Sequence, residues 1–161
     1  MKYSGQFRRM SIYQKFGEAA EAAQLFETAL GTALLCAEGL QKGWHSKPDP
    51  DAAAKILGEI GGITLGNILR RFKNLIHIEE SGIPEQFGRA LKARNRLMHG
   101  FFEYHNFAID TPDGRDQMID DLTSLENELH LSHGVAAGIA KALSDTFLEF
   151  SEGKAPDTPI N

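Results

Sequence analysis

EQFGRALKARNRLMHGFF, residues 85–102, decides the fold, because its apolar residues recur at the spacing of one helix face. Arg94 falls near the middle of that face, and His99 lies at its edge. A guanidinium that points at a core is costly unless it is paired. The stretch therefore predicts an amphipathic helix whose arginine needs a partner or a function. The apolar face consists of Phe87, Ala90, Leu91, Leu97, Met98, Phe101 and Phe102.

The rest of the chain also follows the helical period. Gly100 is expected to cap the motif helix or to kink it, and the last helix is expected to span about 35 residues or to break near Gly134. No segment alternates apolar and polar residues with period two. The pattern favours an all-α, up-and-down helical bundle of about five helices. Its first four helices are expected at about residues 11–40, 50–59, 64–76 and 84–99, and the last helix is expected beyond a turn at residues 111–114.

Length and composition suit a single domain, which we place at residues 1–150 of the 161-residue chain. Residues 1–10 are expected to form a flexible N-terminal arm, and residues 151–161 a disordered tail. The two long helices carry more apolar surface than three short helices cover. This excess favours a symmetric homodimer.

Charge and targeting signals restrict the class of protein. The net charge of −5 argues against a protein that coats nucleic acid non-specifically, although it allows a local basic cleft. The N-terminus lacks the apolar run of a signal peptide, and no segment reaches the roughly 18 apolar residues of a membrane span. The single cysteine, Cys36, cannot form an internal disulfide. We expect a cytoplasmic protein without membrane association.

The spacing from Arg94 to His99 is uninformative by itself, because the arginines and the six histidines of this chain give about one chance match. Its context is more specific, since the arginine lies in an apolar stripe and the histidine closes the helix. In the structural alternative, Arg94 neutralises a buried carboxylate such as Glu126. His99 is then an ordinary residue at the negative end of the helix dipole.

RNRLMHG, residues 94–100, resembles the signature of the HEPN superfamily: an arginine, a polar residue, a few others and then a histidine. Residues 64–66 and 93–102 are also similar to a group of small bacterial HEPN-like proteins. The resemblance implies a helical dimer in which the motif helices of two subunits form a composite cleft. Many members are metal-independent endoribonucleases, often toxins with an antitoxin partner or phage-defence effectors. Others only bind RNA or nucleotides.

The resemblance implies catalytic roles for Arg94, Asn95 and His99, without a cofactor. RNA cleavage without a metal needs a base for the 2′-OH proton, an acid for the leaving 5′-oxygen and a cation near the phosphorane. Two copies of His99 across a twofold axis could perform both proton transfers, and the planar fork of Arg94 matches two phosphate oxygens. Asn95, four residues before His99, could orient the imidazole.

One departure from the family limits what carries over. Members that pair with a nucleotidyltransferase-type antitoxin have a tyrosine two residues after the histidine, where this chain has Phe101. The nearest tyrosine is Tyr104. Modification at the family's tyrosine position is therefore not expected.

The last helix offers an alternative site. Glu126, His130 and His133 recur at spacings of four and three, so one face could present a carboxylate and two imidazoles to a metal. That arrangement would indicate a metal-dependent helical-bundle enzyme. The acidic neighbourhood also fits a solvated face with histidines at its border. We expect no metal site, with this triplet as the alternative.

Basic residues on two consecutive helices could line a path for an RNA backbone. The same residues also fit the outer faces of ordinary amphipathic helices. A non-catalytic RNA- or protein-binding dimer is therefore the main alternative to a ribonuclease. The candidate RNA-binding residues are Arg70, Arg71, Arg89, Lys92 and Arg96.

Overall fold

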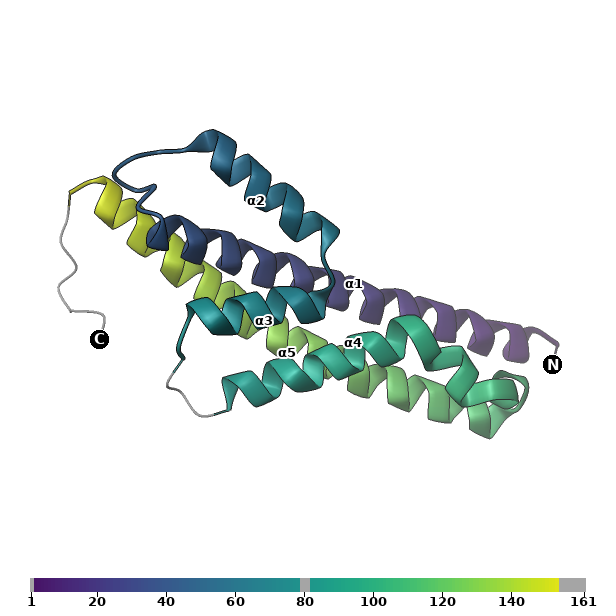
Figure 1. Ribbon diagram of the computed structural model, residues 1–161. Coiled ribbons are helices and arrows are strands. Elements are labelled where there is room, and N and C mark those ends of the chain that lie inside the picture. Colours follow the sequence, from purple (N-terminus) through teal and green to yellow (C-terminus); the bar gives the residue numbers. More distant parts are fainter. Residues whose placement is uncertain (1, 79–81, 154–161) are drawn as a thin grey trace. The chain divides into compact units, whose positions relative to one another are not determined.

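The computed structural model describes residues 2–78 and 82–153. Within these ranges five α-helices and one 3-10 helix follow one another along the chain, and no strand occurs (Figure 1). This confirms the predicted all-α class. The elements are α1 (Lys2–Gln41), α2 (Pro50–Gly62), α3 (Leu65–Leu75), α4 (Ile83–His105), the 3-10 helix η1 (Asn106–Asp110) and α5 (Pro112–Ser151).

The two longest helices, α1 and α5, comprise 40 residues each and exceed their predicted bounds. Residues 2–10, predicted as an arm, begin α1, and α5 passes through Gly134 without a break. One interior glycine costs a helix only about 1 kcal/mol. Of the predicted tail, residues 154–161 lie outside the described ranges. No helix in those ranges has both the length and the apolarity to cross a membrane.

Helix α4 also continues beyond its predicted end. Gly100 lies inside the helix, which ends at His105, and Asn106 then takes a φ of 47°. Asparagine tolerates this left-handed conformation better than most residues, and the conformation ends a helix. Further on, Gly114 of α5 comes so close to η1 that a Cβ would lie 2.2 Å from the carbonyl oxygen of Ala108. A glycine at position 114 therefore permits the corner between α4 and α5.

Side-chain caps begin α2 and α3 near their predicted starts. The carboxylate of Asp49 accepts a hydrogen bond from the backbone N–H of Ala52 at 3.0 Å, and a proline follows in the first turn. The hydroxyl of Thr64 accepts one from the N–H of Asn67 at 3.4 Å. Each cap satisfies an N–H that a helix leaves without a partner in its first turn.

The chain divides into two compact units, each made of two separate segments. The first unit contains residues 1–26 and 84–133, and the second contains residues 27–83 and 134–161. Helices α1 and α5 pass through both units. Helix α4, from its second residue on, belongs to the first unit, and α2 and α3 belong to the second.

In the first unit α4 runs antiparallel to α1 and to α5. The ring centroid of Phe87 lies 5.4 Å from that of Phe26, and the centroid of Phe101 lies 5.9 Å from that of Phe16, so the order reverses between α4 and α1. The contacts with α5 reverse in the same way. They join Gln86 to Ser132, Arg89 to Glu128 and Arg96 to Asp121.

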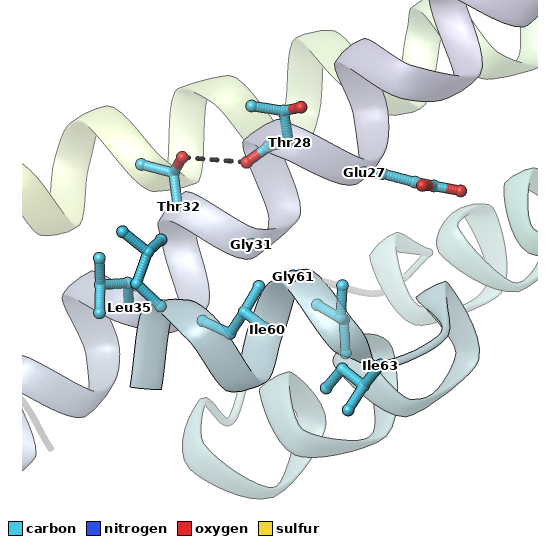
Figure 2. A pocket seen from close by; sticks show the side chains of 10 residues that line it. Glu27, Thr28, Gly31, Thr32, Leu35, Ile60, Gly61 and Ile63 are labelled. Atoms are coloured by element: carbon cyan, nitrogen blue, oxygen red, sulfur yellow. Dashed lines mark hydrogen bonds between the residues drawn. The ribbon is translucent and has the colours of Figure 1, made fainter. Parts of the chain in front are cut away.

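In the second unit α2 packs closely on the second half of α1. A Cβ on Gly31 would lie 3.1 Å from a methyl of Ile60, so the small residue allows the close approach. Beside this contact, a groove of about 300 Å³ opens between the helices (Figure 2). Its lining is Glu27, Thr28, Gly31, Thr32, Leu35, Leu57, Ile60, Gly61, Ile63 and Ile68.

Candidate active site

The buried face of α4 differs from the face that the sequence predicted. Ala93 faces the core, with 7% of its surface exposed, and Arg94 is only half-buried at the border of that face. Met98 and Phe102, predicted as core residues, are 45% and 41% exposed. The prediction that Arg94 lies near the middle of a buried face is therefore wrong. The helix is rotated so that Phe87, Ala90, Ala93, Leu97 and Phe101 form the buried face.

Beyond this border lies a second stripe of α4, which we call the motif flank: Leu91, Arg94, Asn95, Met98, His99 and Phe102. Leu91 and Arg94 are half-buried, and the other four residues are exposed. The motif flank therefore combines apolar side chains with the polar residues of the motif on a solvent-accessible surface.

The three motif residues contact one another through the guanidinium of Arg94. Its Nη1 donates to Oδ1 of Asn95 at 3.2 Å and lies 3.2 Å from Nε2 of His99. A guanidinium only donates hydrogen bonds, so Nε2 of His99 is the acceptor. In a neutral imidazole the proton then lies on Nδ1. Asn95 was predicted to bond His99 directly, but here it acts on Arg94 instead.

This arrangement leaves His99 able to act as a base. An imidazole nitrogen with an electron pair can remove a proton from a nearby hydroxyl once the arginine no longer donates to it, and His99 is exposed enough for a ligand to reach it. The adjacent arginine supplies a positive charge within hydrogen-bond distance of the same nitrogen. A base and a cation are thus present at one place on the surface of α4.

Aromatic side chains of α1 border the motif flank. The ring centroid of Phe102 lies 5.3 Å from that of Phe16 and 6.2 Å from that of Tyr13. Tyr13 is itself 57% exposed. The apolar part of the motif flank therefore continues onto the first half of α1.

The basic residues of α4 lie mainly against carboxylates of α5. Nε of Arg89 lies 3.3 Å from Oε1 of Glu128, and Nη2 of Arg96 lies 2.5 Å from Oδ2 of Asp121. Lys92 is exposed between them. A groove of about 240 Å³ runs between the helices, lined by Arg89, Lys92, Ala93, Arg96, Ser124, Leu125 and Glu128.

The other two candidate RNA-binding residues belong to the second unit. Arg71 pairs with Glu38 at 2.8 Å and with Glu59 at 3.5 Å, so it joins α3 to α1 and α2. Arg70, beside it on α3, is exposed. The pairing gives Arg71 a structural role, which sequence alone did not indicate because its partners are 33 and 12 residues distant along the chain.

In the alternative metal site, Glu126 forms an ion pair with Lys15. Glu126 accepts a hydrogen bond from Lys15 of α1, and this bond raises the pKa of the lysine. Nε2 of His130 lies 3.5 Å from the same carboxylate, and His133 is half-buried one turn further on. Over residues 2–78 and 82–153, no three histidine, cysteine or acidic side chains are arranged to hold a metal ion.

One polar cluster was not predicted from the sequence. Oδ2 of Asp121 lies 2.7 Å from Nε2 of His105 and also accepts from Arg96, whose guanidinium covers the ring of Tyr104. The segment from Phe101 to Ile109 has no clear helical period, so nothing in it placed His105 on a helix. The acidic pair Asp120 and Asp121 on α5 and the basic residues of α4 were the available signal for a polar contact between these two helices.

No family model, no curated protein and no solved structure matches the chain. The HEPN resemblance therefore rests on the residues of the α4 motif and on the helical order of the chain.

Proposed function

We propose that this chain is a HEPN-like, metal-independent endoribonuclease. It acts as a homodimer and cleaves RNA with Arg94 and His99 of both copies, as a toxin or as a phage-defence effector. The observation that carries the proposal is the 3.2 Å contact between Nη1 of Arg94 and Nε2 of His99. Both side chains lie on the motif flank, where a ligand reaches them.

His99 of one copy is the base in this mechanism. Its Nε2 takes the proton of a ribose 2′-OH, and the 2′-oxygen attacks the adjacent phosphorus. The bond from phosphorus to the 5′-oxygen breaks, and the protonated His99 of the other copy gives its proton to that oxygen. The products are a 2′,3′-cyclic phosphate and a free 5′-OH. General acid–base catalysis of this kind contributes about 10²- to 10⁴-fold to the rate.

Arg94 stabilises the charge that develops on the phosphate. In the resting protein its Nη1 donates to His99, and a bound phosphate offers stronger, charged acceptors for the same group. If this N–H donates its hydrogen bond to a phosphate oxygen instead, Nε2 of His99 becomes free to accept the proton of the 2′-OH. Asn95 keeps one hydrogen bond to Nη1 and so positions the guanidinium.

The second copy is proposed to cover the apolar part of the motif flank. Met98, Phe102 and Tyr13 expose 45%, 41% and 57% of their surfaces around the motif. Large apolar side chains gathered on one surface favour association. A twofold axis through this region would place the two motif flanks opposite each other.

A non-catalytic RNA- or protein-binding dimer is the second candidate. The exposed apolar side chains of the motif flank favour it, because the same surface would bind a protein partner without any chemistry at His99. This candidate predicts affinity for RNA or protein without turnover.

Incubation of the purified protein with single-stranded RNA in EDTA tests the proposal. We expect cleavage by the wild type and by His130→Ala, and no cleavage by His99→Ala or Arg94→Ala. His130 is the matched control, because it is a 52% exposed histidine of the same unit that lies on α5. Absence of cleavage by the wild type, or equal cleavage by His99→Ala, would overturn the proposal.

A further inference from the structure

An open pocket of about 440 Å³ lies at the corner where α4, η1 and α5 meet. Pockets of this volume are typical of sites for small organic molecules or for parts of larger ones. Most of the lining side chains are polar and come from three successive elements: Arg96, Tyr104 and His105 of α4, Ala108 of η1, and Gln117 and Asp121 of α5. We call it the corner pocket.

Tyr104 presents a held but exposed aromatic ring to the corner pocket. It is 70% exposed, yet two neighbours fix its orientation. Cζ of Arg96 lies 4.5 Å from the ring centroid, over one face, and the His105 ring meets it nearly perpendicularly at 5.1 Å. Arg96 covers one face of the ring, and the 70% exposure of Tyr104 leaves the opposite face for stacking with a ligand.

The polar groups of the pocket are arranged around Asp121. The carboxylate, 16% exposed, lies 2.5 Å from Nη2 of Arg96 and 2.7 Å from Nε2 of His105, whose side chain is 8% exposed. Arg96 therefore already carries its counter-charge, and so does Asp121. A phosphate gains little from a neutralised arginine, and a cation gains little from a neutralised carboxylate. The pocket suits an uncharged, planar and polar ligand better than an ion.

Gln117 supplies the hydrogen-bonding groups that such a ligand needs. It lies one turn before Asp121 on α5 and is exposed, and its side chain makes no hydrogen bond within the described parts of the chain. Its amide offers both donors and an acceptor. A glutamine amide pairs with the edge of a nucleobase while an aromatic ring stacks on the face of the base.

We propose that the corner pocket binds a nucleobase of single-stranded RNA, stacked on Tyr104 and hydrogen-bonded by Gln117. This inference rests on the proposed function for its ligand, because the base belongs to the RNA strand that is cleaved at His99. Tyr104 follows His99 by five residues on α4, which is about 7.5 Å along the helix axis and about 140° around it. A strand bound at His99 therefore reaches the pocket by passing around α4, so the bound base lies a few nucleotides from the cleaved phosphate.

Fluorescence anisotropy with a labelled single-stranded RNA of twelve nucleotides and with the same strand in a duplex tests this proposal. The protein carries His99→Ala, so that the RNA is not consumed, and the buffer contains EDTA. We expect tighter binding of the single strand. Tyr104→Ala should weaken that binding about 10-fold, whereas Tyr104→Phe should retain it because the stacking face remains. Phe107→Ala is the matched control, since this aromatic of η1 is 76% exposed but does not line the pocket.

The results separate the pocket from the catalytic proposal. Unchanged single-strand affinity in Tyr104→Ala, or an equal loss in Phe107→Ala, would overturn the pocket, even if the wild type cleaves RNA. Single-strand binding that depends on Tyr104, together with a wild type that cleaves no RNA, would support the pocket and overturn the catalytic proposal. Equal affinity of the His99→Ala protein, with Tyr104 intact, for the single strand and the duplex would also overturn the pocket.

Discussion

His99 and His105 lie six residues apart on α4, and their Nε2 atoms have opposite roles. Nε2 of His99 accepts from Arg94 at 3.2 Å, on the exposed motif flank. Nε2 of His105 lies 2.7 Å from Asp121 in a side chain that is 8% exposed, and because a carboxylate only accepts, this nitrogen carries the proton.

The comparison shows how the partner of an imidazole decides what the imidazole can do. The donor beside His99 leaves Nε2 without a proton, so its electron pair can accept one when Arg94 moves away. The acceptor beside His105 fixes the proton and holds α4 to α5. The proposed chemistry thus belongs to His99 on the motif flank and a structural role to His105, and the following changes test this division.

The largest effect is expected at His99. His99→Ala should lower the rate of RNA cleavage at least about 100-fold, because the base and the acid of the dimer are both lost. The free energy of unfolding should change by no more than about 0.5 kcal/mol, since the side chain is exposed. Cleavage assays and urea unfolding measure the two quantities. A large loss of stability would place His99 with the positioning residues instead.

A strong effect on folding is expected at the corner itself. Gly114→Ala places a Cβ 2.2 Å from the carbonyl oxygen of Ala108, which is backbone and cannot turn aside. We expect the free energy of unfolding to fall by about 3 kcal/mol. Gly88→Ala on α4 is the control, because nothing lies within 4 Å of its added Cβ. That control should gain up to about 1 kcal/mol, and equal behaviour of the two variants in urea would refute the close approach.

His105→Ala should lower the free energy of unfolding and have little effect on RNA cleavage, the opposite of His99→Ala. Removal of a charge-assisted hydrogen bond from a largely buried side chain should cost about 2 kcal/mol of unfolding free energy. Cleavage per folded molecule at saturating RNA should stay close to that of the wild type, because His105 takes no proton from RNA. Parallel measurement of the unfolding midpoint and of the cleavage rate checks both parts. Full loss of activity in a stable His105→Ala protein would contradict the division.

The smallest effect is expected at Lys15, whose ion pair with Glu126 joins α1 to α5 away from both histidines. Lys15→Met should lower the unfolding free energy by less than about 1 kcal/mol, because the pair is partly exposed. Glu126 raises the pKa of Lys15 above its ordinary 10.5, so the stabilisation is complete below that pH. It is lost as the pH rises through the raised pKa. Urea unfolding of both proteins from pH 8 to pH 11.5 should show the difference shrink.

The sequence predicted the helical class and the starts of α2, α3 and α4 well, because these depend on local signals. The apolar period of residues 85–102 identified α4, and Asp49 with Pro50 identified the start of α2. Helix ends were predicted less well. Gly100 and Gly134 lie inside helices, since one glycine does not end a helix whose neighbours pack.

The parts of the site that were missed depend on contacts between distant segments. In the structure α4 is turned by a fraction of a turn from the predicted orientation, so Arg94 lies at the border of the core face and not near its middle. This orientation is set by the packing of α4 on α1 and α5. Arg71 was predicted to bind RNA, but Glu38 and Glu59 neutralise it. The link between His105 and Asp121 spans 16 residues and a corner that begins with a left-handed asparagine.

Identification of the ends of the products formed from RNA in EDTA tests the proposed role of His99 as the base. We expect the wild type to leave a 2′,3′-cyclic phosphate on one fragment and a free 5′-OH on the other, and His99→Ala to leave the RNA intact. Fragments with a 5′-phosphate and a 3′-OH, or the same fragments from His99→Ala, would contradict this role, because neither result arises from a proton transfer at Nε2 of His99.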